Sequence, residues 1–167
     1  MYSLYVLIVS VVVLRLAGLF GVRRLSRINE CVRYGFAVMF VFTGVSHFTS
    51  LKADFVRMIP FDFLRSEFTV YLTGVMEIAG ALWLFWGKHL MYACYYLILF
   101  LLAVLPANIY ASIHNLPVAG KPPTEMYFRI FIQFFYITLL VYIAPGKGDG
   151  KKVKDWLYRS WYPFGRR

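Results

Sequence analysis

An acidic residue, Glu77, lies in the middle of an almost wholly apolar run, which reads FTVYLTGVMEIAGALWLFWG over residues 68–87. The run is long enough to cross a bilayer, and an ionisable group at that depth is costly and usually serves a proton pathway or a ligand. Thr73, Gly74 and Gly80 recur with Glu77 at helical spacing. Since small residues let another helix approach closely, we expect Glu77 to face neighbouring helices that supply its polar partners.

Polar side chains lie at matching depths in three other apolar segments. At the helical rise of about 1.5 Å per residue, His47, Asn108 and Arg129 fall roughly one turn inside the outer membrane boundary, and Glu77 and Gln133 fall roughly one to two turns deeper. We therefore expect these five side chains to converge on one intramembrane pocket on the outer side.

The chemistry of such a pocket would be proton transfer and polar binding. His47 and Glu77 are the predicted catalytic pair, because an imidazole and a carboxyl group can exchange a proton with a bound molecule. Desolvation would keep Glu77 neutral, whereas the guanidinium of Arg129 would hold it ionised, and the sequence leaves both states open. The predicted ligand-binding residues are Asn108, Arg129, Gln133, Gly44 and Thr73.

Each of these residues also has a structural interpretation. His47 fits equally well as an interface histidine bonded to a carbonyl group, and Arg129 could extend to the headgroups. Asn108 and Gln133 could form only interhelical hydrogen bonds, which contribute about 0.6 kcal/mol on average in membrane proteins. Glu77 is the hardest of the set to explain by structure alone, so we expect a functional role for at least part of the cluster.

The composition indicates an integral membrane protein. Of 167 residues, 60% are hydrophobic and only 16% are charged, which is outside the range of soluble domains. The net charge of +10 does not indicate nucleic-acid binding, because the basic residues lie between and after the apolar runs and no separate basic module remains. The two cysteines form no CxxC pair and have no histidine at metal-ligand spacing, so no metal site is predicted.

Five transmembrane helices are predicted within a single membrane domain of residues 1–167. Their approximate bounds are 4–20, 35–50, 68–87, 90–112 and 125–144, with Thr124 as the cap of the last one. Pro106 should interrupt the fourth helix and free a backbone carbonyl. Residues 51–67, which Pro60 divides, should form an interfacial segment over the outer end of the bundle.

The distribution of basic residues predicts the orientation of the bundle. The arginine-rich segment 21–34 and the basic, aromatic tail 145–167 should both be cytoplasmic, which places the N-terminus outside. The first helix lacks a basic start and a cleavage site, so we expect it to be retained rather than removed as a signal peptide.

Several short motifs in residues 35–144 resemble those of the DoxX-like family of small integral membrane proteins. The stretches FTGVSHFTS, MIP, VYLTGVMEIAG, LPANIYA and FRIFIQ follow one another in the order of that family. The resemblance implies an all-α, polytopic transmembrane bundle with a four-helix core, located in the bacterial inner membrane. The first helix with its basic loop (1–34) and the tail (145–167) are additions to that core.

The resemblance also implies candidate functions, since some DoxX-like proteins are associated with thiosulfate:quinone oxidoreduction and others with oxidoreductase complexes or protein maturation. The leading hypothesis is a subunit of membrane oxidoreduction that binds a quinone or another lipophilic molecule, such as a lipid. The sequence carries no haem, flavin or iron–sulfur motif, so a protein partner would supply the electrons. One alternative is a non-enzymatic chaperone or assembly subunit for a client membrane protein. Another is a non-redox acid–base enzyme or binder for a small lipid-like substrate. Whether the chain is an enzyme, and whether it forms an oligomer, stays open.

Overall fold

The computed structural model describes residues 2–87, 89–121 and 125–144. The predicted helix cap Thr124 and the tail 145–167 lie outside these residues. The described chain consists of helices joined by short connections. In chain order they are α1 (Tyr2–Leu19), η1 (Arg23–Ser26), α2 (Ile28–Ser46), α3 (Lys52–Met58), η2 (Asp62–Leu64), α4 (Glu67–Trp86), α5 (Leu90–Ile113) and α6 (Met126–Ile143).

The described residues include five helices that are long and apolar enough to cross a membrane, which are α1, α2, α4, α5 and α6. The prediction of an all-helical bundle with five candidate membrane spans is therefore confirmed. The helix boundaries agree within a few residues except at α2, which begins at Ile28 rather than near residue 35. Its first turns carry Glu30 and Arg33, whose side chains pair at 2.8 Å one turn apart, so charged residues form part of the helix.

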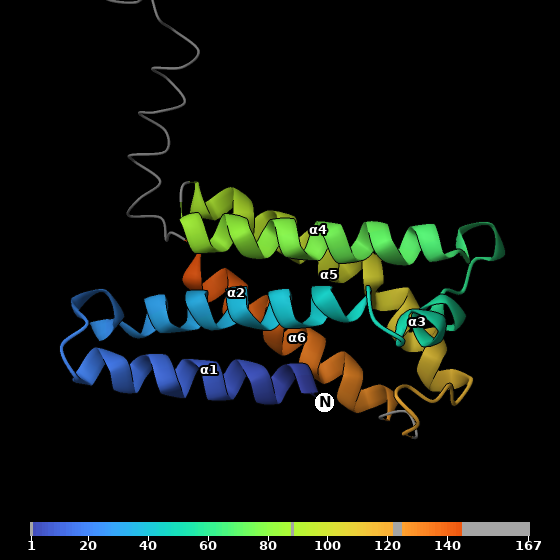
Figure 1. Cartoon of the computed structure of the whole chain (residues 1–167), viewed down its shortest axis with the longest axis horizontal. Helices are drawn as coiled ribbons and strands as arrows, with labels where there is room; N and C mark the ends of the chain where they lie inside the picture. The colour runs from blue at the N-terminus through green and yellow to red at the C-terminus, as the bar shows by residue number, and fades with distance from the viewer. Residues whose placement is uncertain (1, 88, 122–124, 145–167) are drawn as a thin grey trace, which may run out of the picture.

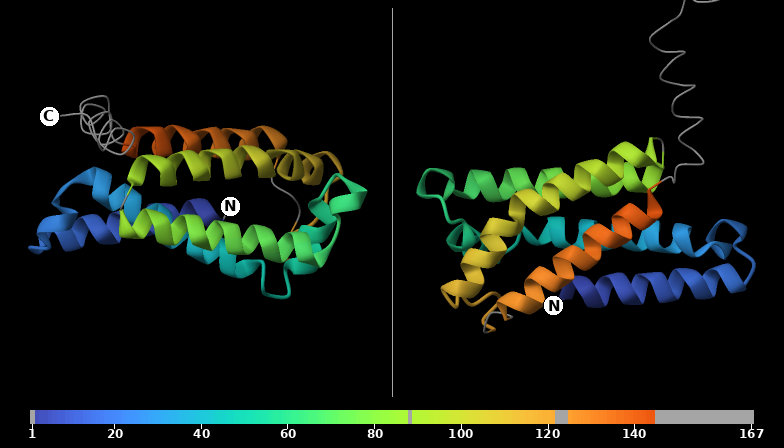
Figure 2. Two further views of the ribbon diagram at one scale, coloured as in Figure 1. Left: turned by 90° about the horizontal axis from the view of Figure 1, so that it is seen from above. Right: turned by 180° about the vertical axis from the view of Figure 1, so that it is seen from behind.

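The helix α2 occupies the centre of the bundle (Figure 1), where it lies between α1 and α4. Seen from above and from behind (Figure 2), α5 packs on α4 and α6 packs on α5 and α2. The core follows this arrangement, because its largest fully buried side chains include Phe36, Phe40 and Met39 of α2. Cys94 is also fully buried there, which agrees with a packing role.

The segment between α2 and α4 folds over one end of the bundle, which we call the α3 end. Helix α3 contacts α4 and α5, and it ends just before Pro60, which cannot donate a backbone hydrogen bond to continue it. Ser66 then caps α4, because its hydroxyl accepts a hydrogen bond from the backbone nitrogen of Thr69 at 3.3 Å. The opposite end, formed by η1, the start of α2 and the end of α4, is called the arginine end.

Candidate functional site

Two glycines bring α2 and α4 close together near the α3 end. A Cβ atom added at Gly74 of α4 would lie 2.7 Å from Cβ of His47 and 3.1 Å from the carbonyl oxygen of Gly44. A Cβ atom added at Gly44 would lie 2.7 Å from Cγ1 of Ile78. No larger residue fits at either position without a shift, so the missing side chains allow the two backbones to approach. This approach brings the polar residues of α2 and α4 within contact distance.

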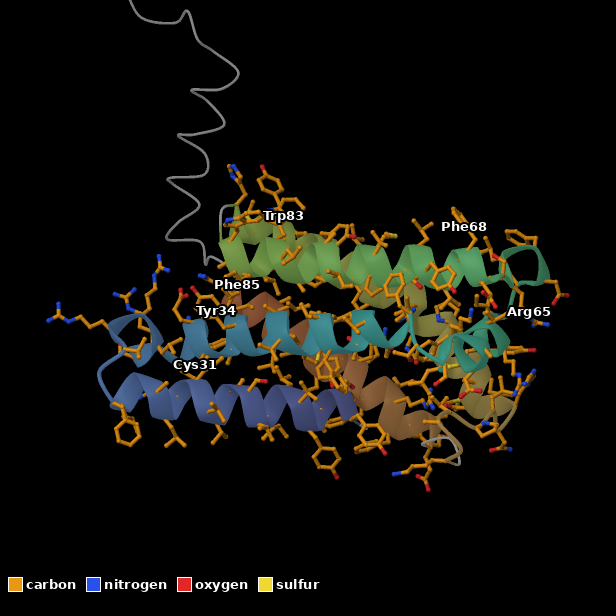
Figure 3. The ribbon with its side chains drawn as sticks, in the orientation of Figure 1. Cys31, Tyr34, Arg65, Phe68, Trp83 and Phe85 are labelled. Atoms are coloured by element: carbon orange, nitrogen blue, oxygen red, sulfur yellow. The ribbon has the colours of Figure 1, made fainter. Side chains whose placement is uncertain are left out.

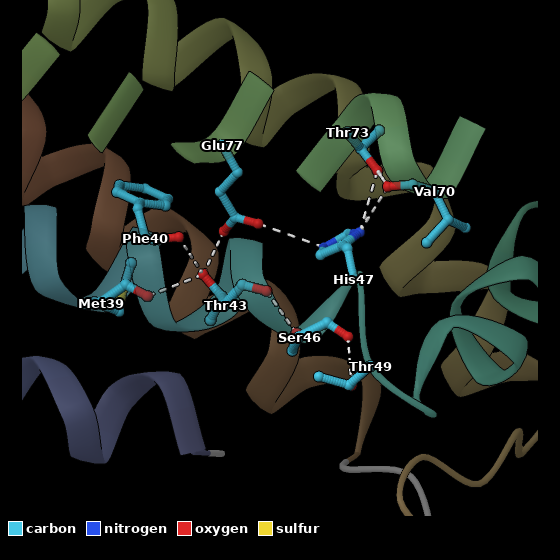
Figure 4. A network of polar contacts seen from close by, with 9 residues as sticks. All are labelled: Met39, Phe40, Thr43, Ser46, His47, Thr49, Val70, Thr73 and Glu77. Atoms are coloured by element: carbon cyan, nitrogen blue, oxygen red, sulfur yellow. Dashed lines mark hydrogen bonds and ion pairs between the residues drawn. The ribbon is translucent and has the colours of Figure 1, made fainter. Parts of the chain in front are cut away.

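The carboxyl group of Glu77 lies inside this interface, with only 7% of the residue exposed. One carboxyl oxygen lies 3.4 Å from Nε2 of His47, and the other shares a hydrogen bond with the hydroxyl of Thr43 (Figure 4). His47 follows the last residue of α2 as its C-cap and lies one turn after Thr43, so one face of the helix end presents both to Glu77. The acid therefore has polar partners on both oxygens, as a carboxyl group at this depth requires.

The second ring nitrogen of His47 points in the other direction. Nδ1 lies 3.1 Å from the carbonyl oxygen of Val70 and 3.3 Å from the hydroxyl of Thr73, both on α4 (Figure 4). The imidazole ring also stacks on Phe55 of α3, with ring centroids 4.6 Å apart. The position of the imidazole is thus determined by α2, α3 and α4 together.

The contacts of Nδ1 allow two tautomers of the imidazole, because the carbonyl of Val70 can only accept a hydrogen bond whereas the hydroxyl of Thr73 can donate one. In the tautomer that bonds Val70, Nδ1 of His47 carries the hydrogen and donates it. Nε2 then faces Glu77 either as the donor of an imidazolium to a carboxylate or as the acceptor from a carboxylic acid. Both arrangements hold one proton between the two groups and have the same total charge. The pair can therefore move a proton between Glu77 and His47 without a change in the net buried charge.

A second polar group joins α5 and α6. Gln133, of which 5% is exposed, accepts a hydrogen bond from the side-chain amide of Asn108 at 3.4 Å. Its own amide group donates to the backbone carbonyl of Leu101. The helix α5 continues through Pro106, so the predicted interruption is wrong. Pro106 leaves the carbonyl of Leu102 without its helical donor, and Gln133 bonds the neighbouring carbonyl of Leu101.

Arg129 lies one turn before Gln133 on α6 and has no acidic partner among the residues that the structure describes. Its Nε atom is buried and makes no hydrogen bond there. A guanidinium group in such a position lacks the counter-charge that intramembrane ions normally have.

The predicted site residues thus fall into two groups. Between described residues, no hydrogen bond or ion pair joins Glu77 or His47 to Asn108, Arg129 or Gln133. The placement of all five in one pocket, and each assigned role, stays a prediction. The predicted ligand-binding residues of the first group are Gly44, at the helix contact, and Thr73, at the imidazole.

Two residues beside the acid were not among the predicted site residues. Thr43 could have been found, because it lies one turn from His47 on the same helix face. Phe55 gives no such signal, since its contact with His47 depends on how α3 folds over the bundle. Among the described residues, no cluster of three His, Cys, Asp or Glu side chains could hold a metal ion.

A comparison with protein families finds a match over residues 36–144 to a domain of unknown function (DUF8561). The chain belongs to this family. The matched region includes most of α2 and all of α3, α4, α5 and α6, and therefore both polar groups, whereas α1 and η1 lie outside it. Searches of curated proteins and of solved structures find no match.

Proposed function

We propose that this membrane protein binds a quinone or another lipophilic molecule beside Glu77 and His47, as a subunit associated with membrane oxidoreduction. The observation that carries the proposal is the contact, at 3.4 Å, of His47 with Glu77, which lies within a candidate membrane span. A quinone exchanges protons at its oxygen atoms when it is reduced or oxidised, and this pair can donate or accept one. A partner protein would supply the electrons.

The surroundings of the pair suit a flat, apolar ligand that carries oxygen atoms. Phe55 stacks on the imidazole, and Phe48 stacks on Tyr71 with centroids 5.6 Å apart, so aromatic rings lie on the α3 side of the polar residues. Asn108 and Arg129 would orient a second oxygen atom of the same ligand if it bridges the two polar groups. The buried Nε atom of Arg129 supports this assignment, because it makes no hydrogen bond among the described residues and a ligand oxygen would provide an acceptor.

The test is to measure which small molecules the purified protein retains. The full chain is extracted in mild detergent, its lipids are removed with organic solvent, and quinones are quantified by mass spectrometry. Glu77→Gln removes the proton of the acid but keeps its size. We expect at least about tenfold less quinone per chain in this variant, because a hydrogen bond to a charged group contributes about 1.5–3 kcal/mol.

Asp62→Asn is the matched control. Asp62 lies at the α3 end, but its side chain is 90% exposed and pairs with Arg65 at the surface, so the variant should retain as much quinone as wild type. Wild type that carries no lipophilic molecule other than bulk phospholipid would contradict the proposal, and so would an equal loss in both variants.

The same experiment separates the alternatives. Retention of a lipid without redox activity, dependent on Glu77, would favour a non-redox acid–base enzyme or binder. Co-purification of a protein partner that Glu77→Gln does not release would favour a chaperone or assembly subunit. A DoxX-like function and a location in the bacterial inner membrane belong to the quinone proposal, since they rest on the motif resemblance alone.

A further inference from the structure

A cleft at the arginine end gathers four basic side chains far from the Glu77 group. It has a volume of about 460 Å³ and lies between η1, the first turns of α2 and the last turn of α4. The arginines that line it are Arg23, Arg24, Arg27 and Arg33. Figure 3 shows Tyr34 and Phe85 at this end of the bundle, whereas Arg65 and Phe68 lie at the α3 end.

Arg33 forms a fixed side of the cleft. Its guanidinium pairs with Glu30 at 2.8 Å, donates to the hydroxyl of Tyr34 at 2.8 Å, and lies 4.4 Å from the centroid of that ring. The ring of Tyr34 in turn packs edge-on against Phe85, with centroids 5.4 Å apart. A Cβ atom at Gly87 would lie 3.1 Å from the guanidinium, so the glycine makes room for it. Arginines that only set membrane orientation need no such arrangement.

The remaining positive charge of the cleft has no acidic partner among the residues that the structure describes. Glu30 is the only acid among the lining residues, and it pairs with Arg33. Among the described residues, Arg23, Arg24 and Arg27 form no salt bridge. The Nε atom of Arg33 is buried without a hydrogen-bond partner. The cleft therefore presents a surplus of guanidinium donors, which suit the oxygen atoms of a phosphate group.

The position of the cleft favours a lipid phosphate over a soluble one. It lies at the ends of α2 and α4, two candidate membrane spans, and so at the depth of the lipid headgroups. Trp86 lines it and is 81% exposed, and Phe20 beside η1 is 89% exposed, which is typical of aromatic residues at the membrane interface. Basic pockets between membrane helices bind anionic headgroups in this setting.

We propose that the arginine-end cleft is a binding site for the phosphate headgroup of an anionic phospholipid. Arg23, Arg24 and Arg27 provide the charge, and Arg33 provides donors in a fixed orientation. The acyl chains run beside Trp86 along the exposed apolar surface of the bundle. This site is independent of the proposed quinone site, which lies at the far end of α2 and halfway along α4.

The test is native mass spectrometry of the full chain with palmitoyl-oleoyl phosphatidylglycerol and with phosphatidylcholine of the same acyl chains. We expect wild type to retain the anionic lipid at least about tenfold better, and Arg27→Gln to lower this retention about fivefold. Replacing Arg23, Arg24 and Arg27 together by Gln should abolish the preference. These side chains are exposed, so the variants should fold, which circular dichroism checks.

Arg57→Gln is the matched control, since Arg57 is an exposed arginine at the α3 end. It should retain wild-type selectivity, and so should Glu77→Gln, which separates this site from the quinone site. Equal retention of both lipids by wild type, or equal losses in Arg57→Gln and Arg27→Gln, would overturn the proposal. Inorganic phosphate and glycerol phosphate should not displace the lipid at equal concentration, and displacement by either would show a site for soluble phosphate instead.

Discussion

The two polar helix contacts of the bundle are built in different ways. Between α2 and α4, the acid Glu77 meets His47 and Thr43, and the second nitrogen of His47 meets Val70. Between α5 and α6, the side-chain amide of Gln133 bonds Asn108 and the carbonyl of Leu101. The neighbouring Arg129 has neither an acidic partner nor an acceptor for its Nε atom among the described residues. Within the described part of the chain, the polar groups of the first contact have partners on every side, whereas Arg129 at the second contact does not.

This difference suggests different roles during binding. A proton pair whose groups satisfy each other is stable without ligand and is ready to exchange a proton when one arrives. The buried Nε–H of Arg129 has no acceptor among the described residues, so it can donate a hydrogen bond to a ligand oxygen or a water molecule. In the proposed function, the α2–α4 contact supplies the proton chemistry and the α5–α6 contact supplies the recognition.

The largest expected effect comes from separating α2 and α4. In Gly74→Ala the new methyl group would meet the Cβ atom of His47 and the backbone of Gly44, neither of which can rotate away. We expect a loss of about 1–3 kcal/mol in the free energy of unfolding, the typical cost of overpacking. Steric trapping or denaturation in detergent micelles measures it, and loss of quinone should accompany it.

Gly35→Ala is the control for this prediction. Its new methyl group would meet the Cγ2 atom of Val11, at the end of a side chain, at the contact of α1 with α2. A smaller loss is expected, with quinone retention unchanged. If Gly35→Ala lowers the free energy of unfolding as much as Gly74→Ala does, the contact of α2 with α4 is no more sensitive to an added methyl group than the contact of α1 with α2.

A smaller effect is expected at the α5–α6 contact. Gln133→Leu removes the hydrogen bonds to Asn108 and to the carbonyl of Leu101. Two interhelical hydrogen bonds at about 0.6 kcal/mol each predict a loss of about 1 kcal/mol. Thr138→Val, which removes only a bond to the carbonyl of Phe134 within α6, should change the same measurement very little. Equal losses would mean that Gln133 does not link the helices.

Replacing Arg129 should have the opposite effect to replacing Gln133, because it should weaken ligand binding rather than stability. Arg129→Met removes a guanidinium that has no charged partner among the described residues, so the free energy of unfolding without ligand should change by less than about 1 kcal/mol. Quinone retention should nevertheless fall, because a donor to the ligand is lost. A large loss of stability without ligand would show that the cation is already paired, and the two helix contacts would then be alike.

The helices could be predicted from the sequence because membrane spans are long apolar runs, and the start of α2 was missed because Glu30 and Arg33 pair within the helix. The matching depths predicted that His47 and Glu77 lie close together, and His47 does contact Glu77. Depth alone does not say which helices are neighbours. Among the described residues Arg129 forms no ion pair with Glu77, since α4 packs mainly on α2 and α5, whereas α6 packs on α5 and α2.

The segment 51–67 shows the same limit. Its mixed composition predicts an interfacial position, and Pro60 does divide it. The contact of Phe55 with His47 depends on the path of the chain over the α3 end, which no local pattern encodes. Packing between segments that are distant in sequence therefore decides the surroundings of the imidazole.

The smallest expected effect concerns the anchor that holds α3 against α4. Lys52 of α3 donates to the hydroxyl of Tyr71 at 3.0 Å and to the carboxylate of Glu67 at 2.9 Å. The bond to Tyr71, followed by that to Glu67, raises the pKa of Lys52 above its ordinary value of 10.5. Because the folded pKa is the higher one, this contribution to stability is fully present below pH 10.5 and is lost only as the pH rises through the folded value.

Tyr71→Phe should lower the pKa of Lys52 toward its ordinary value, since the hydroxyl is the larger of the two favourable contacts. The rate at which Lys52 reacts with an amine reagent, followed against pH by peptide mass spectrometry, measures this shift, because only the neutral amine reacts. Stability at neutral pH should change little, because exposed ion pairs contribute about 0–1 kcal/mol. Should Lys52 react with the same pH profile in wild type and Tyr71→Phe, the anchor does not hold α3, and the stacking of Phe55 on His47 must have another cause.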